Sequence, residues 1–198
     1  MTKRVLCYGD SNTWGQTASR TRLDEAKQWP NILWRALGED YWVIQEGLSG
    51  RVAGNYETTL ALNGQPVFEA TYYIASPVDL VIVALGTNDF KKKYGRSARD
   101  IANDLLWYKQ AIQDYAELSE GRNTQLLYLC PADFTPTEGY FEVIDGVREE
   151  LVEIMRSFDA PILELNDLEM SSDGIHYSEA AHQEVARRVK EKIEEMLA

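Results

Sequence analysis

The sequence predicts an α/β fold: a single three-layer α/β/α domain with a mostly parallel five-stranded sheet. Short β-branched segments alternate along the chain with longer amphipathic segments, as strands and helices do in such folds. Residues 80–85 form a continuous apolar run, which is typical of a strand buried on both faces. The 198 residues contain no internal repeat, low-complexity tract or Pro/Gly/Ser-rich linker, so we expect one domain over residues 1–198.

Strands are predicted where apolar and β-branched residues form short runs, at residues 4–8, 41–45, 79–85, 125–130 and 161–165. Gly9 ends the first run and Pro131 ends the fourth. Helices are predicted where apolar residues recur at helical spacing, at residues 29–37, 100–118, 143–158 and 179–197. Pro30 suits the first turn of the first helix, and Gly38 suits its end. Because helices connect successive strands, we expect right-handed crossovers and a parallel sheet.

Composition argues against several classes of function. Twenty basic residues against 32 acidic ones give a formal net charge of −12, which disfavours a nucleic-acid partner. The longest purely apolar run, residues 80–85, falls far short of the ~20 residues of a membrane helix. The N-terminus lacks the apolar stretch of a secretory signal, so we expect a cytoplasmic location. Cys7 and Cys130 show no metal-ligand spacing and are predicted to be buried free thiols.

Polar segments follow or approach the predicted ends of four strands, at residues 9–12, 47–50, 86–89 and 173–176. In an open parallel sheet the ligand crevice lies at the carboxyl ends of the strands. The functional residues are therefore expected in these four segments.

The chain has two histidines, which simplifies the search for a general base. His182 lies within the last predicted helix, where we expect a surface or flanking position. His176 lies in a loop three residues after Asp173, so the carboxylate can bind one ring nitrogen and leave the other free as a base. A polar loop that enters a helix would explain the Asp-x-x-His pair equally well.

Ser11 is the candidate nucleophile, because it follows Gly9 and Asp10 at a sharp strand-to-helix turn where a hydroxyl can project into the crevice. The alternative is that Ser11 caps the helix that follows. Gly50 offers a backbone N–H, and Asn88 a side-chain amide, to a developing oxyanion. The alternative for these two is an ordinary turn. Because complementary groups gather at one predicted sheet edge, we favour the catalytic interpretation.

In chain order, the four segments resemble the four blocks of the SGNH (GDSL) hydrolase family: Gly9-Asp10-Ser11-Asn12, Leu48-Ser49-Gly50, Gly86-Thr87-Asn88-Asp89 and Asp173-Gly174-Ile175-His176. Residues 7–15 and 45–51 further resemble the arylesterase and acyltransferase (perhydrolase) branch of that family. The resemblance implies a flavodoxin-like fold with Ser11 as nucleophile, His176 as base and Asp173 as the carboxylate that orients it. It also implies an oxyanion hole formed by the backbone N–H groups of Ser11 and Gly50 and the side chain of Asn88.

Five residues near these blocks are candidates for substrate binding: Trp14, Asp10, Thr87, Phe134 and Phe141. Trp14 lies three residues after Ser11 and would either wall the acyl site or pack against the fold. Phe134 and Phe141 would either line an acyl pocket or cover the core.

The resemblance implies a serine esterase that hydrolyses short-chain acyl (acetyl to butyryl) or aryl esters through an acyl-enzyme, with acyl transfer or perhydrolysis as a further reaction. The alternatives are a carbohydrate acetylesterase, a lysophospholipase or thioesterase, or a non-catalytic ligand-binding domain. A metal-dependent hydrolase built on Asp10, Asp89 and Asp173 would have only His176 as a nitrogen ligand, so we expect no metal and no cofactor. The expected partner is a small-molecule ester, and assembly into a homo-oligomer stays open.

A basic cluster directly follows the Asn88 block and consists of Lys91, Lys92, Lys93, Arg96 and Arg99. Such a run is typical of a solvated loop. The alternative is contact with an anionic substrate or with an acidic neighbouring subunit.

Overall fold

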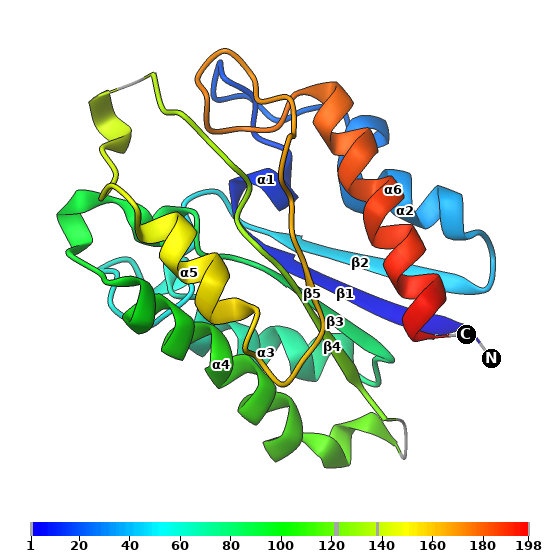
Figure 1. The fold of residues 1–198 in the computed structure, drawn as a ribbon. Helices are drawn as coiled ribbons and strands as arrows, with labels where there is room; N and C mark the ends of the chain where they lie inside the picture. The colour runs from blue at the N-terminus through cyan, green and yellow to red at the C-terminus, as the bar shows by residue number, and fades with distance from the viewer. Residues whose placement is uncertain (1, 121–122, 138, 198) are drawn as a thin grey trace.

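A computed structural model describes residues 2–120, 123–137 and 139–197 (Figure 1). The described residues form a sheet of five parallel strands in the order β2-β1-β3-β4-β5. The strands are β1 (Lys3–Gly9), β2 (Tyr41–Gly47), β3 (Leu80–Ala84), β4 (Gln125–Leu129) and β5 (Ile162–Leu163). Each predicted strand segment overlaps one of them: β1 and β2 extend beyond their predicted segments, and β3, β4 and β5 lie within theirs. The predicted α/β fold is confirmed.

The helices of the described residues are α1 (Ser11–Trp14), α2 (Trp29–Leu37), α3 (Gly64–Ala75), α4 (Ala98–Asp114), α5 (Val147–Met155) and α6 (Glu179–Met196). Helix α2 has the predicted bounds. Helix α4 begins before the predicted start because Ser97 and Asp100 form a capping box, in which the Asp100 N–H donates to Ser97 Oγ at 3.2 Å. Helix α5 is shorter than predicted, since Gly146 precedes it in the left-handed conformation.

Helix α3 was not predicted, and its composition explains why. The segment includes Val67, Thr71, Tyr72, Tyr73 and Ile74, which are β-branched or aromatic residues enriched in strands. Tyr72 is buried against the sheet, so packing outweighs the local preference.

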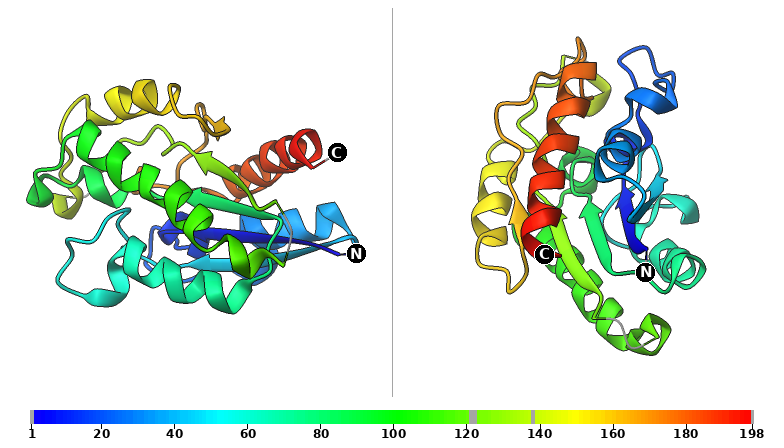
Figure 2. Two further views of the ribbon diagram at one scale, coloured as in Figure 1. Left: turned by 90° about the horizontal axis from the view of Figure 1, so that it is seen from below. Right: turned by 90° about the vertical axis from the view of Figure 1, so that its right-hand side faces the viewer.

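Side chains of each strand alternate between two apolar cores, one on each face of the sheet. Leu6 and Tyr8 of β1 belong to the core that also contains residues of α3, α4 and α5. Val5 and Cys7 belong to the core shared with α2 and α6, and these two helices pack side by side (Figures 1 and 2). Cys7 and Cys130 are buried free thiols, as predicted. Among the described residues, no helix is both long and apolar enough to cross a membrane.

Strands β1, β2 and β3 end at the same level, because Gly9 pairs with Gly47 of β2 and with Ala84 of β3. The chain winds in opposite directions from β1 to its two neighbours, which creates a crevice beyond these strand ends. Helix α1 begins at this edge of the sheet, directly after β1. A Cβ on Gly47 would lie 2.2 Å from the Trp14 backbone nitrogen, so glycine permits the close approach of α1 to the sheet edge.

Candidate active site

Ser11 is the first residue of α1, directly after the end of β1. Its cap is Asp10, whose carboxylate accepts the Asn12 N–H at 2.9 Å. The interpretation of Ser11 as the capping residue is therefore wrong. The Ser11 side chain is buried, and its Oγ lies 3.1 Å from Nε2 of His176, across 165 positions of sequence.

His176 is held on its other side by Asp173, with 2.6 Å between Nδ1 and Oδ2. The second oxygen of Asp173 accepts the backbone N–H groups of Ile175 and His176, both at 3.0 Å. Burial raises the pKa of Asp173, but the hydrogen bonds from His176 and Ile175 outweigh it and lower the pKa below its usual value. An ionised Asp173 requires a proton on Nδ1, which leaves the Nε2 lone pair directed at Ser11.

Asn12 joins the two parts of this arrangement, a role that was not predicted. Its side-chain amide donates to the Ile175 carbonyl at 3.3 Å and accepts the Tyr177 N–H at 3.0 Å. The loop that carries His176 is thereby fixed to α1. Asn12 lies next to Ser11 in the first block, which is the one sequence signal for this role.

The three predicted oxyanion donors lie in the segments that follow the ends of β1, β2 and β3. Gly50 has a φ of 86°, the positive value that favours glycine at this turn. Among the hydrogen bonds of the described residues, the N–H groups of Ser11 and Gly50 donate to no protein acceptor. The buried Asn88 amide donates to the Arg51 carbonyl at 3.1 Å, which brings it beside the Gly50 turn.

Arg51 is a buried cation whose role was not predicted. Its Nη1 donates to the carbonyls of Gly9 at 2.9 Å and Glu46 at 2.5 Å, and its guanidinium lies 4.1 Å from the Tyr8 ring centroid. Arg51 therefore fixes the Gly50 turn to the ends of β1 and β2. The sequence signal was only its position directly after Gly50.

The buried carboxylates of Asp89 and Asp10 accept hydrogen bonds from neighbouring segments. Asp89 accepts the Ala53 N–H at 2.9 Å and the Tyr56 hydroxyl at 2.5 Å, and burial raises the pKa of Asp89 to about 7. Burial raises the pKa of Asp10 to about 6, although Asn12 and Thr87 donate hydrogen bonds to it. Across the described residues, no group of three or more His, Cys, Asp or Glu side chains could hold a metal ion.

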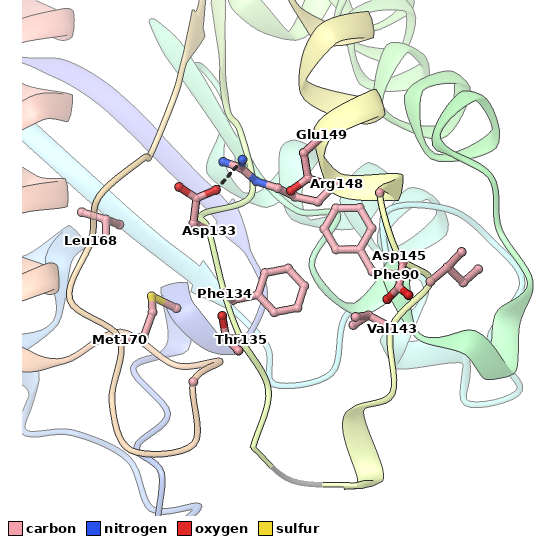
Figure 3. Close-up of a pocket in the computed structure, with 13 residues that line it drawn as sticks. Phe90, Asp133, Phe134, Thr135, Val143, Asp145, Arg148, Glu149, Leu168 and Met170 are labelled. Carbon is pink, nitrogen blue, oxygen red and sulfur yellow. Dashed lines mark ion pairs between the residues drawn. The ribbon is translucent and has the colours of Figure 1, made fainter.

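A cavity of about 550 Å³ lies beside these loops (Figure 3). Phe134 lines it and stacks on Phe90, with 5.7 Å between ring centroids. Leu168 and Met170 lie across the cavity from Val143 (Figure 3). Ser11 and His176 are not among the described residues that line it, so the cavity flanks the hydrogen-bonded site.

The remaining two aromatic candidates lie outside the cavity wall. Phe141 is buried and packs edge-on against Phe134, with its ring 4.7 Å from the Lys91 ammonium. Trp14 is half-buried, and the Arg22 guanidinium lies 5.0 Å from its ring centroid. The structure thus brings Phe134 into the cavity wall and leaves Phe141 behind it.

The expected surface position of His182 is wrong. His182 is 1% exposed, and its Nδ1 accepts the Trp29 N–H at the start of α2, at 3.2 Å. Its polar neighbours Gln183 and Glu184 suggested an exposed position, but His182 shares the buried face of α6 with Val185. Burial lowers the pKa of His182 to about 4.

The basic cluster divides into two kinds of lysine. Lys92 and Lys93 are exposed, as expected of a solvated loop, and lie 3.9 Å from Glu142 and 3.6 Å from Glu57. For Lys91 that expectation is wrong, because its Nζ donates to Oδ1 of Asn88 at 2.7 Å.

Comparison with known proteins identifies the family. The model of the GDSL-like lipase/acylhydrolase family matches residues 7–184, and no curated protein sequence matches the chain. The native aryl esterase of M. smegmatis is 28% identical, with a TM-score of 0.87 over 98% of this chain and 99% of that one. A carbohydrate acetylesterase from Sinorhizobium meliloti is 25% identical, with a TM-score of 0.85 over 98% of this chain and 100% of that one.

A lipase/acylhydrolase from Enterococcus faecalis, at 17% identity and a TM-score of 0.71 over 98% of this chain and 97% of that one, shares the fold. The matched residues 7–184 contain all four blocks recognised in the sequence. The chain therefore belongs to the GDSL-like lipase/acylhydrolase family, the SGNH hydrolases, and has their single-domain α/β fold.

Proposed function

We propose that this protein is a serine esterase that cleaves small acyl esters through a covalent acyl-enzyme on Ser11. The observation that carries the proposal is one continuous chain of hydrogen bonds: 3.1 Å from Ser11 Oγ to His176 Nε2, and 2.6 Å from His176 Nδ1 to Asp173 Oδ2. This is the geometry that converts a serine hydroxyl into a nucleophile at neutral pH.

The reaction follows from these contacts. Ser11 Oγ attacks the ester carbonyl carbon while its proton moves to Nε2 of His176, and the Asp173 carboxylate stabilises the imidazolium that forms. The N–H groups of Ser11 and Gly50 and the Asn88 amide donate to the oxyanion. The carbon–oxygen bond to the alcohol then breaks, and the alcohol takes the proton from Nε2. Water, deprotonated by His176, attacks the acyl-enzyme and releases the carboxylic acid and Ser11.

The backbone donors argue against a non-catalytic ligand-binding domain. Among the described residues, the N–H groups of Ser11 and Gly50 have no protein acceptor, although the turns that carry them are held by Asp10 and Arg51. Rigidly held, unpaired donors beside a buried Ser–His–Asp chain are what an oxyanion hole requires, and this combination favours an enzyme.

The flanking cavity supports small esters as the substrate class. Its volume of about 550 Å³ lies within the usual range of ligand pockets, and Phe90, Phe134 and Met170 give it an apolar lining. We propose short-chain acyl (acetyl to butyryl) or aryl esters, with the acyl or aryl group beside the Phe134 ring. The similarity to the M. smegmatis aryl esterase supports the same assignment.

Carbohydrate acetylesterase is the second candidate, favoured by the similarity to the Sinorhizobium meliloti enzyme. The cavity wall also has polar residues: Arg148 forms an ion pair with Asp133 and lies near Glu149, and Asp145 lies on another part of the wall, near Val143 (Figure 3). Carboxylates and a guanidinium can hydrogen-bond sugar hydroxyls. In that case the acyl group would be acetyl and the leaving group a sugar.

Labelling with a serine-directed phosphonate tests the proposal. We expect one adduct by intact mass, on Ser11, together with hydrolysis of p-nitrophenyl acetate. Ser11→Ala should lose both. Ser157→Ala is the matched control, because Ser157 is an exposed serine just after the end of α5. Its hydroxyl donates a hydrogen bond to the Ile154 carbonyl. An adduct on another residue, or full activity of Ser11→Ala, would overturn the nucleophile.

A substrate panel distinguishes the two candidate functions. Aryl acetate, butyrate and octanoate are compared with acetylated sugars, each by kcat/KM. If short-chain esters are the substrates, octanoate should have the lowest kcat/KM of the three aryl esters. A preference for acetylated sugars over aryl acetate would favour the carbohydrate acetylesterase.

A further inference from the structure

The orientation of the Asn88 amide is determined by two neighbours of opposite character. A side-chain amide can be turned by 180° with almost no change in shape, so its hydrogen-bond partners decide which end carries oxygen. The Lys91 ammonium is only a donor and lies 2.7 Å from Oδ1. The Arg51 carbonyl is only an acceptor and lies 3.1 Å from Nδ2. The reversed amide would oppose donor to donor and acceptor to acceptor.

Lys91 reaches Asn88 because its backbone is fixed on both sides. The Lys92 N–H donates to the Glu142 carbonyl at 2.8 Å, and the Ile144 N–H donates to the Phe90 carbonyl at 3.1 Å, which pairs this segment with residues 142–144. The ammonium lies 4.7 Å from the centroid of the Phe141 ring. Lys91 is consequently half-buried, whereas Lys92 and Lys93 are exposed.

One donor of Asn88 remains after these contacts. Nδ2 carries two hydrogens, and the Arg51 carbonyl accepts one of them. In the described residues no protein group accepts the second hydrogen, since the Arg51 bond is the one that Nδ2 donates. A charged donor on Oδ1 also polarises the amide, which makes the remaining N–H a stronger donor.

We propose that Lys91 is a positioning residue for the hydrolytic reaction, which acts through Asn88: its ammonium holds Oδ1 so that the free Nδ2–H is presented to the oxyanion. The inference rests on the proposed function, in which Asn88 is an oxyanion donor. Lys91 itself touches no reacting atom in this scheme. Removing its charge should therefore weaken the transition state while leaving substrate binding unchanged.

Substitutions at neighbouring lysines test the role. Lys91→Met keeps the long apolar stem over Phe141 and removes the donor, so kcat should fall about 10-fold or more, with KM nearly unchanged. Lys91→Arg keeps a charged donor and should restore most of kcat. Lys92→Met is the control: it makes the same charge change at an exposed position, and its kcat should match that of the native enzyme.

A double-mutant cycle separates action through Asn88 from a general structural or electrostatic effect. In an Asn88→Ala background, Lys91→Met should have almost no further effect on kcat, because its target is gone. An equal loss in both backgrounds, or a native kcat for Lys91→Met, would overturn the proposal. Thermal denaturation of each variant identifies activity losses caused by unfolding. A loss of kcat that parallels a lower melting temperature, and that Lys91→Arg does not restore, would also contradict the proposal.

The same experiment distinguishes failure of this inference from failure of the proposed function. If Ser11→Ala and Asn88→Ala retain activity, the esterase mechanism is wrong and the role of Lys91 falls with it. If those two variants lose activity and Lys91→Met does not, the mechanism stands and the role of Lys91 alone is wrong.

Discussion

The two histidines of this protein are buried to nearly the same extent, and their surroundings give them opposite chemistry. His176 is 4% exposed and His182 is 1% exposed. His176 lies between the carboxylate of Asp173 and the hydroxyl of Ser11. His182 accepts a backbone N–H from Trp29, so its Nδ1 must be unprotonated.

Burial alone makes a histidine a poor base, because it destabilises the charged form that a base must reach. That is the state of His182, whose pKa is lowered to about 4 by burial. At His176 the Asp173 carboxylate lies 2.6 Å from Nδ1 and stabilises the imidazolium. The partner of a buried histidine, more than its exposure, therefore decides whether the histidine can act as a base.

The largest expected effect separates the two histidines directly. His176→Asn should lower kcat/KM on p-nitrophenyl acetate by about 10⁴-fold or more, since the proposed base is lost. His182→Asn should retain activity, because asparagine keeps an acceptor for the Trp29 N–H. Steady-state kinetics of both purified variants check this. Comparable losses in the two variants would remove the distinction on which the assignment of the base depends.

Removing the charge of Asp173, which contacts His176, is expected to have the next largest effect. Asp173→Asn should lower kcat by about 10³–10⁴-fold, because an amide cannot stabilise the imidazolium or fix the Nδ1–H tautomer. Its Oδ1 can still accept the N–H groups of Ile175 and His176, so the loop should keep its conformation. The measurement is kcat beside a circular dichroism spectrum. A folded variant with native kcat would show that Asp173 only stabilises the conformation of the loop.

Much of the fold was predictable because hydrophobic periodicity reports directly on buried faces. The apolar run of β3 and the stripe of α6 are buried as their patterns indicate. Helix α3 was missed because its β-branched and aromatic residues are typical of strands, and only packing against the sheet decides for a helix. The local secondary-structure preference of a segment carries no information about its packing against residues distant in the sequence.

The meeting of the four blocks at the candidate site was predictable. Gly9, Gly47 and Ala84 end three adjacent strands at one level, so the residues that follow them must meet. The supporting residues were not predictable. Asn12 contacts residues 175 and 177, and Arg51 reaches back to Gly9, which no sequence spacing reveals. The predicted surface position of His182 was wrong for a related reason, because its exposure depends on the packing of α2 against α6.

A smaller effect should appear in stability. The pKa of His182 is about 4 in the folded chain against ~6.5 unfolded, so the unfolded chain takes up the proton first as pH falls. This contribution to stability is complete above about pH 6.5 and is lost as pH falls toward 4, by at most about 3 kcal/mol. His182→Asn, which does not titrate, should lose less stability than the native protein between about pH 7 and pH 4.5.

Urea unfolding of both proteins across this range measures the effect. Asp10 and Asp89, with pKa values raised to about 6 and about 7, titrate in the same range with the opposite sign. Their stabilising contribution is lost as pH rises, and it is common to both proteins. The informative quantity is therefore the difference between the two unfolding free energies. A difference that does not change with pH would contradict a neutral, buried His182.

The smallest expected effect is on the acid limb of the activity profile. In the proposed reaction, Nε2 of His176 accepts the Ser11 proton. His182→Asn should leave the midpoint of that limb where the native enzyme has it, because His182 contacts Trp29 and stays neutral until the pH nears 4. The profiles of kcat for both proteins, each recorded only over the range where the protein remains folded by circular dichroism, provide the test. A midpoint displaced in His182→Asn would mean that the two histidines are electrostatically coupled, and that the inert one helps to set the protonation of the proposed base.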